Sequence, residues 1–156
     1  MVNVYDLIFN KERIPQLIKE HSAEYVSRKA DSPERICTLV NDIFHACDLP
    51  EERMWSICVD ASCNVVGIFE VAHGTTNYAM SNIRGILQRA LMCGAVFIIA
   101  IHNHPSGNTQ LSDEDVSVAK KLDQAATLVE IPLLDFIAVG DNPAAFSSAR
   151  ESGFIG

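Results

Sequence analysis

The chain has 156 residues, of which 48% are hydrophobic and 21% charged, and its formal net charge is −8. This length and composition predict one globular domain with its own hydrophobic core. The sequence has no run of eighteen apolar residues and no signal-peptide pattern at its N-terminus, so we expect a cytoplasmic protein without a membrane span. Nucleic-acid backbones are bound through Lys and Arg, and the acidic balance argues against direct nucleic-acid binding.

The first part of the chain is predicted to be a short helical lead, residues 1–31, ahead of the main domain at residues 32–156. Apolar residues at helical spacing place a helix before Asp31: Ile14, Leu17, Ile18, Tyr25 and Val26. A second helix is expected to begin with Ser32 as N-cap and Pro33 in its first turn. The five cysteines form no C-x-x-C pair, and we expect them to be reduced.

The rest of the chain alternates strands and helices. Residues 53–60 and 64–71 read as two antiparallel strands joined by a polar connection of hairpin length. A helix is expected to open at Ser81 and close at Gly94, followed by a buried strand over residues 95–101. A helix from Ser112 and an apolar strand over residues 132–139 complete the pattern, which predicts an α/β fold with a mixed central sheet flanked by helices.

Two histidines stand at the end of the buried strand. Side chains at i and i+2 of a strand point to one face, so His102 and His104 can converge on one metal ion. Pro105 stops the strand, Ser112 stands at a helix N-cap, and Asp115 falls in the first turn of that helix. His102, His104 and Asp115 therefore form a candidate Zn²⁺ site, since two histidines and a carboxylate leave a position open for water.

Hydrolysis at such a site needs further groups besides the ligands. Glu70 is the candidate general base because it is a carboxylate in an otherwise apolar strand. Ser112 is the candidate group that stabilises a tetrahedral intermediate, in addition to capping its helix. Each residue also has a purely structural interpretation: Ser112 and Asp115 as an N-capping arrangement, Glu70 as an edge-strand charge, and the His-x-His pair as a solvated strand end.

At these residues the sequence resembles the JAMM (MPN+) metallopeptidases, and more closely the RadC-like branch of bacterial proteins. The shared pattern is an upstream Glu, then His-x-His-Pro, then Ser-x-x-Asp, and it stands here at Glu70, residues 102–107 and residues 112–115. Gly74-Thr75 and residues 133–135 support it, and the resemblance runs from about Ser32 to Ser148. It implies a three-layer, cytidine-deaminase-like α/β fold that holds Zn²⁺ through the positions of His102, His104 and Asp115. Glu70 and Ser112 would take the catalytic roles.

The resemblance also limits what can be transferred. RadC-like proteins usually have His after the Leu-Asp pair, where this chain has Phe136. They commonly carry a helix-hairpin-helix module, and the first fifty residues here contain no glycine for its hairpins. We therefore expect a zinc-dependent hydrolase of peptide or isopeptide bonds acting on a peptide or protein substrate. The alternatives are a non-proteolytic DNA repair or recombination accessory protein and a metal-dependent nuclease; the oligomeric state, a homodimer included, stays open.

Overall fold

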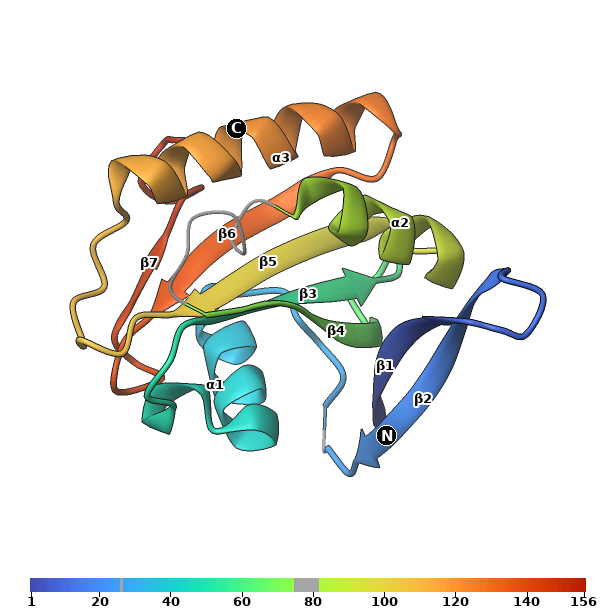
Figure 1. Ribbon diagram of the computed structural model, residues 1–156. Helices are drawn as coiled ribbons and strands as arrows, with labels where there is room; N and C mark the ends of the chain where they lie inside the picture. Colours follow the sequence, from blue (N-terminus) through green and yellow to red (C-terminus); the bar gives the residue numbers. More distant parts are fainter. Residues whose placement is uncertain (26, 75–81) are drawn as a thin grey trace.

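The computed structural model describes residues 1–25, 27–74 and 82–156 (Figure 1). Within these ranges a seven-stranded mixed sheet forms the centre, in the order β2-β1-β4-β3-β5-β6-β7. Figure 1 shows α2 and α3 on one face of the sheet and α1 on the other, so the predicted three-layer α/β arrangement is confirmed. The strands are β1 (Val2–Phe9), β2 (Pro15–Ala23), β3 (Arg53–Val59), β4 (Val65–His73), β5 (Phe97–Asn103), β6 (Leu133–Val139) and β7 (Phe146–Ser148).

The helices begin and end at residues with clear capping chemistry. In α1 (Pro33–Phe44), the Ser32 hydroxyl accepts a hydrogen bond from the backbone N–H of Arg35, as its position predicts. A short 3₁₀ helix, Ala46–Asp48, follows α1. Helix α2 (Ile83–Cys93) has Asn82 as N-cap and ends at Gly94 with φ of +69°, which confirms the predicted C-terminus. The predicted start at Ser81 lies outside the described residues.

The prediction of an N-terminal helix is wrong. Residues 2–23 form the antiparallel hairpin β1–β2 instead. At its turn the Asn10 side chain accepts hydrogen bonds from the backbone N–H groups of Glu12 and Ile14, and Arg13 takes a left-handed φ of +65°. Because β1 joins the sheet beside β4 through the pair Val4 and Ile68, tertiary pairing overrides the helical spacing. The domain boundary at residue 32 stays a prediction, but residues 1–31 are not a helical lead.

The sheet separates two apolar cores. Met54, Phe69 and Phe136 belong to the core beneath α2 and α3, whereas Trp55 and Ile68 belong to the core beneath α1. Neighbouring residues of one strand therefore face opposite layers, as the two-residue repeat of a strand requires. This alternation decides which polar side chains at the strand ends can meet. No helix within the described ranges is long and apolar enough to cross a bilayer.

Candidate metal centre

Three side chains converge where β5 ends and α3 (Asp113–Leu128) begins. The Nε2 atoms of His102 and His104 lie 3.0 Å apart. Asp115 Oδ1 lies 3.3 Å from the Nε2 of His102, and its Oδ2 lies 3.2 Å from the Nε2 of His104. His102 is fully buried, while the side chains of His104 and Asp115 are 13% and 12% exposed, so solvent reaches the group only through these two side chains. The structure thus brings together all three residues predicted as ligands.

The loop after β5 orients His104. Its Nδ1 lies 2.7 Å from the backbone carbonyl of Asn108, and because a carbonyl only accepts, Nδ1 carries the proton. Nε2 is then the nitrogen with a free lone pair in the neutral ring. Gly107 makes this loop possible, since it adopts a φ of +82° that favours glycine, and its N–H donates to the carbonyl of His104. A backbone carbonyl therefore selects the tautomer that a metal ion requires.

The start of α3 orients Asp115. The Ser112 hydroxyl accepts from the backbone N–H of Asp115 at 3.0 Å, and the backbone N–H of Ser112 donates to Asp115 Oδ2 at 3.0 Å. This is the predicted capping box, with Asp in place of the usual Glu. The capping and metal-binding interpretations therefore coexist, because one carboxylate serves both. Ser112 itself is exposed beside the ligands.

Electrostatics in the cluster favour a bound cation. Burial would raise the pKa of Asp115, but hydrogen bonds from His102 and His104 outweigh it and hold that pKa well below its usual range. The hydrogen bond to Asp115 raises the pKa of His104, against the opposing effect of burial. Asp115 therefore stays ionised, and its charge attracts a proton or a cation to the two imidazoles.

The donor set fits zinc. The ligand atoms of His102, His104 and Asp115 all lie within 4.8 Å of one another. Two imidazole nitrogens facing each other at 3.0 Å repel unless a proton or a cation lies between them. Two histidines and one carboxylate form the protein ligand set of hydrolytic zinc sites. These residues would hold the ion.

Glu70 lies away from this cluster. It pairs with Trp55 across β3 and β4, on the α1 face, whereas His102 pairs with Met54 on the α2–α3 face. Its carboxylate forms an ion pair with Arg53 at 3.3 Å, and its side chain is 40% exposed. The structure therefore does not bring Glu70 to the ligands, because strand alternation directs it to the opposite face of the sheet.

A different carboxylate, Glu52, lies across from the ligands. In the antiparallel pair β3–β5, Met54 lies opposite His102. Because the strands run in opposite directions, Glu52, two residues before Met54, lies opposite His104, two residues after His102. The negative charge of Glu52 contributes to the raised pKa of His104. Glu52 cannot be recognised from the sequence alone, because β3 and β5 are not consecutive strands and their register cannot be read from either one. The signal that was available is an acidic pair, residues 51–52, directly before a buried strand.

Asn103 fixes the segment that carries Glu52. Its Oδ1 accepts from the backbone N–H of Arg53 at 2.7 Å, and its Nδ2 donates to the backbone carbonyl of Glu51 at 3.0 Å. Asn103 is only 1% exposed, so these hydrogen bonds are buried. The residue between the two histidine ligands thus ties the backbone on both sides of Glu52 to the end of β5.

The comparisons with known proteins agree on one family. The RadC-like JAB domain pattern matches residues 30–154. UPF0758 proteins are similar along most of the chain: one from Porphyromonas gingivalis is 34% identical over 67% of this chain and 46% of its own length, and one from Shouchella clausii is 34% identical over 80% of this chain and 52% of its own. One from Methanosarcina barkeri is 29% identical over 87% of this chain and 58% of its own. The chain thus spans about half the length of these curated relatives. It belongs to the RadC-like JAB domain family.

Proposed function

We propose that this chain is a zinc-dependent hydrolase of peptide or isopeptide bonds, with His102, His104 and Asp115 as the metal ligands. The observation that carries the proposal is the convergence of the two Nε2 atoms and the Asp115 carboxylate. The loop after β5 orients His104, and the start of α3 orients Asp115. When bound, zinc supplies a Lewis acid that makes water nucleophilic near neutral pH. Family membership supports the same chemistry.

The chain's own residues would move the proton. Glu52, opposite His104 and partly buried, is the carboxylate best placed to take a proton from the attacking water and deliver it to the leaving nitrogen. We assign this role to Glu52 in place of Glu70, whose side chain lies on the other face of the sheet. The Ser112 hydroxyl accepts from Asp115 N–H, which leaves its own proton to donate to the negative oxygen of a tetrahedral intermediate.

The two glutamates form a matched pair for the test. The substrates are fluorogenic peptides cleaved at an α-peptide bond and peptides joined through a lysine ε-amino group. Glu52→Gln should retain zinc and lower kcat by about 10²–10⁴-fold, the usual contribution of a general base. Glu70→Gln removes the same charge and should hydrolyse as the parent does. A fully active Glu52→Gln protein, or an inactive Glu70→Gln protein, would show that the base is misassigned.

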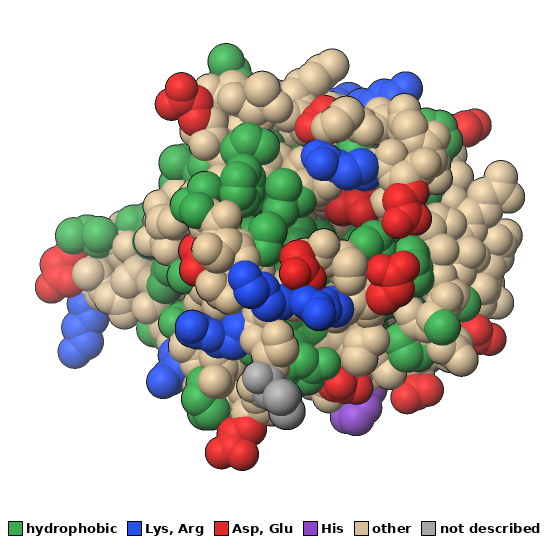
Figure 2. All heavy atoms as spheres, turned by 180° about the vertical axis from the view of Figure 1, so that it is seen from behind, with side chains coloured by type: hydrophobic (Ala, Val, Ile, Leu, Met, Phe, Trp, Pro, Cys, Tyr) green, Lys and Arg blue, Asp and Glu red, His purple; other side chains and the backbone are tan. Residues whose placement is uncertain are grey.

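The same assay separates the nucleic-acid alternatives. Figure 2 shows Lys and Arg side chains interspersed with Asp and Glu on one face of the molecule. Arg35 forms an ion pair with Asp31 at 2.9 Å. Together with the net charge of −8, this favours a protein substrate over a phosphate backbone. Single-stranded and double-stranded DNA belong in the panel. Zinc-dependent cleavage of DNA, with none of either peptide class, would contradict the proposal.

A further inference from the structure

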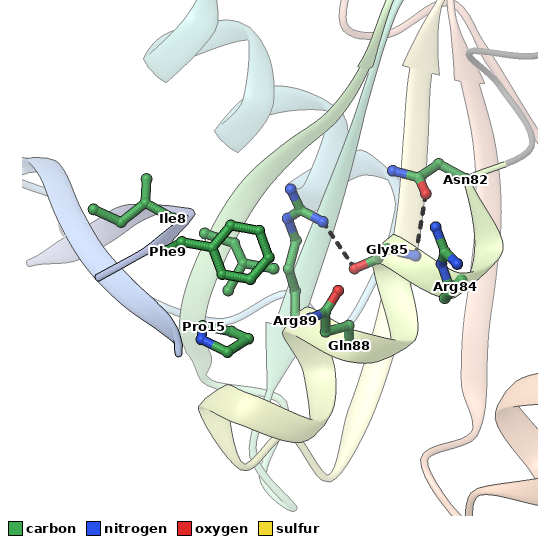
Figure 3. Close-up of a pocket in the computed structure, with 9 residues that line it drawn as sticks. Ile8, Phe9, Pro15, Asn82, Arg84, Gly85, Gln88 and Arg89 are labelled. Carbon is green, nitrogen blue, oxygen red and sulfur yellow. Dashed lines mark hydrogen bonds between the residues drawn. The ribbon is translucent and has the colours of Figure 1, made fainter. Parts of the chain in front are cut away.

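A cavity lies between α2 and the β1–β2 hairpin. Its volume is about 260 Å³. The hairpin contributes Ile8, Phe9 and Pro15 to its wall, and α2 contributes Arg84, Gln88 and Arg89 (Figure 3). Figure 3 shows Arg89 reaching from the helix toward the hairpin, with the Phe9 ring on the opposite side. None of the three metal ligands lines this cavity.

Neither arginine of this cavity forms a salt bridge with a carboxylate in the part of the chain that the structure describes. Arg89 Nη1 donates to the backbone carbonyl of Gly85 at 3.0 Å, but its Nε is buried and lacks a hydrogen-bond acceptor there. The side chains of Arg84 and Gln88 form no hydrogen bond or ion pair within the described residues. Each guanidinium has five N–H donors, so most of the donors in this cavity are unused.

The position of these charges is unfavourable for the protein alone. Arg84 lies in the first turn of α2, where the helix dipole is positive and opposes a cation. Burial lowers the pKa of Arg89, and the only carboxylate among the described residues that counters this effect is Asp6, which acts at longer range. Both side chains remain cationic at neutral pH. A bound anion would supply the missing charge and accept the unused donors.

We propose that this cavity binds an oxyanion, a carboxylate or a phosphate, that is joined to an apolar group. Two guanidinium groups and the Gln88 amide recognise the oxyanion, since arginine binds both anions through paired N–H donors. The apolar group lies against the hairpin wall, where Phe9 is 54% and Ile8 38% exposed. A cavity with an apolar wall and a few polar side chains is typical of a small-ligand site. The proposal does not depend on the metal centre.

Binding of four small probes to the full chain tests it by isothermal titration calorimetry. Phenyl phosphate and phenylacetate carry the two candidate anions on one apolar group, benzyl alcohol lacks the charge, and inorganic phosphate lacks the apolar group. We expect phenyl phosphate or phenylacetate to bind more tightly than both benzyl alcohol and inorganic phosphate. Which of the two aromatic anions binds more tightly then distinguishes a phosphate ligand from a carboxylate ligand. Failure of both to bind, or equal binding of benzyl alcohol, would overturn the proposal.

Substitutions locate the site. Arg84→Gln and Arg89→Gln should each weaken binding of the preferred probe by about tenfold or more, as loss of a charge-assisted hydrogen bond does. Arg84 is exposed, so its variant keeps the fold even if loss of the Arg89 contact to Gly85 harms α2. Arg28→Gln removes the same charge from an exposed position outside the cavity and should bind as the parent does. If Arg28→Gln weakened probe binding equally, the effect of the other two variants would come from net charge alone, and the site would be refuted.

Discussion

The ring of Phe136 packs against the ring of His102, with the two centroids 5.2 Å apart. Phe136 stands where RadC-like proteins usually have a histidine. The Nδ1 atom of His102 is buried and has no hydrogen-bond partner among the described residues. Metal-bound histidines normally donate their second N–H to a carboxylate, a carbonyl or water, which orients the ring and raises its basicity. In this chain an apolar ring packs against His102 instead.

Phe136→His should therefore raise zinc affinity. An imidazole at this position can accept a hydrogen bond from His102 Nδ1. Loss of such a hydrogen-bond partner from a metal-binding histidine lowers metal affinity by about 10–100-fold. Competition with a chromophoric zinc chelator measures the change. Phe136→Leu is the control, because it removes the aromatic ring and still offers no acceptor. If the two variants bind zinc equally, the unpartnered Nδ1 does not limit affinity.

Zinc affinity should fall as the pH is lowered. Zinc must displace the proton of His104, whose pKa lies above the ordinary value near ~6.5 because Asp115 accepts its hydrogen bond. Asp115 has a depressed pKa and stays ionised through this range, so it adds no pH dependence. Below the pKa of His104, the dissociation constant of zinc should rise about tenfold for each unit by which the pH falls. Well above that pKa, His104 should add no pH dependence to zinc binding. Chelator competition between about pH 5.5 and 8 measures this slope, and a flat profile would contradict the shift.

Local chemistry made the ligands predictable. His102, His104 and Asp115 lie within fourteen residues, and strand alternation plus one N-cap suffices to bring them together. The placement of Glu52 opposite His104 is harder to predict, because it depends on the pairing of β3 with β5, which are separated along the chain by β4 and α2. The helical spacing of the apolar residues in the N-terminal segment does not predict its strands, because β1 is held by pairing with β4 more than sixty residues away.

Asn103→Ala should separate metal binding from catalysis. The substitution leaves the backbone N–H of Arg53 and the carbonyl of Glu51 without their buried partner, which should cost about 1–3 kcal/mol in the free energy of unfolding. Glu52 then loses its fixed position, while all three metal ligands remain. We expect near-normal zinc content by metal analysis, lower stability in urea unfolding and reduced kcat on any substrate that Glu52→Gln disables.

Asn103→Asp is the informative companion. Its carboxylate can still accept from Arg53 N–H but cannot donate to the Glu51 carbonyl, so only one of the two contacts survives. It also preserves the size of the side chain. If both variants keep the parent's kcat, the position of Glu52 does not depend on Asn103.

The close contact between Tyr5 and Gly67 tests how the N-terminal hairpin is held. A Cβ atom at residue 67 would lie 2.8 Å from the Tyr5 ring, closer than carbon atoms approach. Without this contact Gly67→Ala should stabilise a strand, because glycine loses more backbone entropy on folding. With it, the methyl group must displace Tyr5 and β1, and we expect a loss of about 1–3 kcal/mol in the free energy of unfolding, measured in urea.

A double-mutant cycle with Tyr5→Ala assigns that loss to the contact. Tyr5→Ala is destabilising by itself, since the ring packs beside Phe69 at a centroid distance of 6.0 Å. Adding Gly67→Ala to Tyr5→Ala should then cost little or be favourable, because the methyl group no longer meets a ring. Zinc content should stay at the parent value throughout, since no metal ligand lies on β1 or β4. An additive cycle would mean that Tyr5 does not contact residue 67.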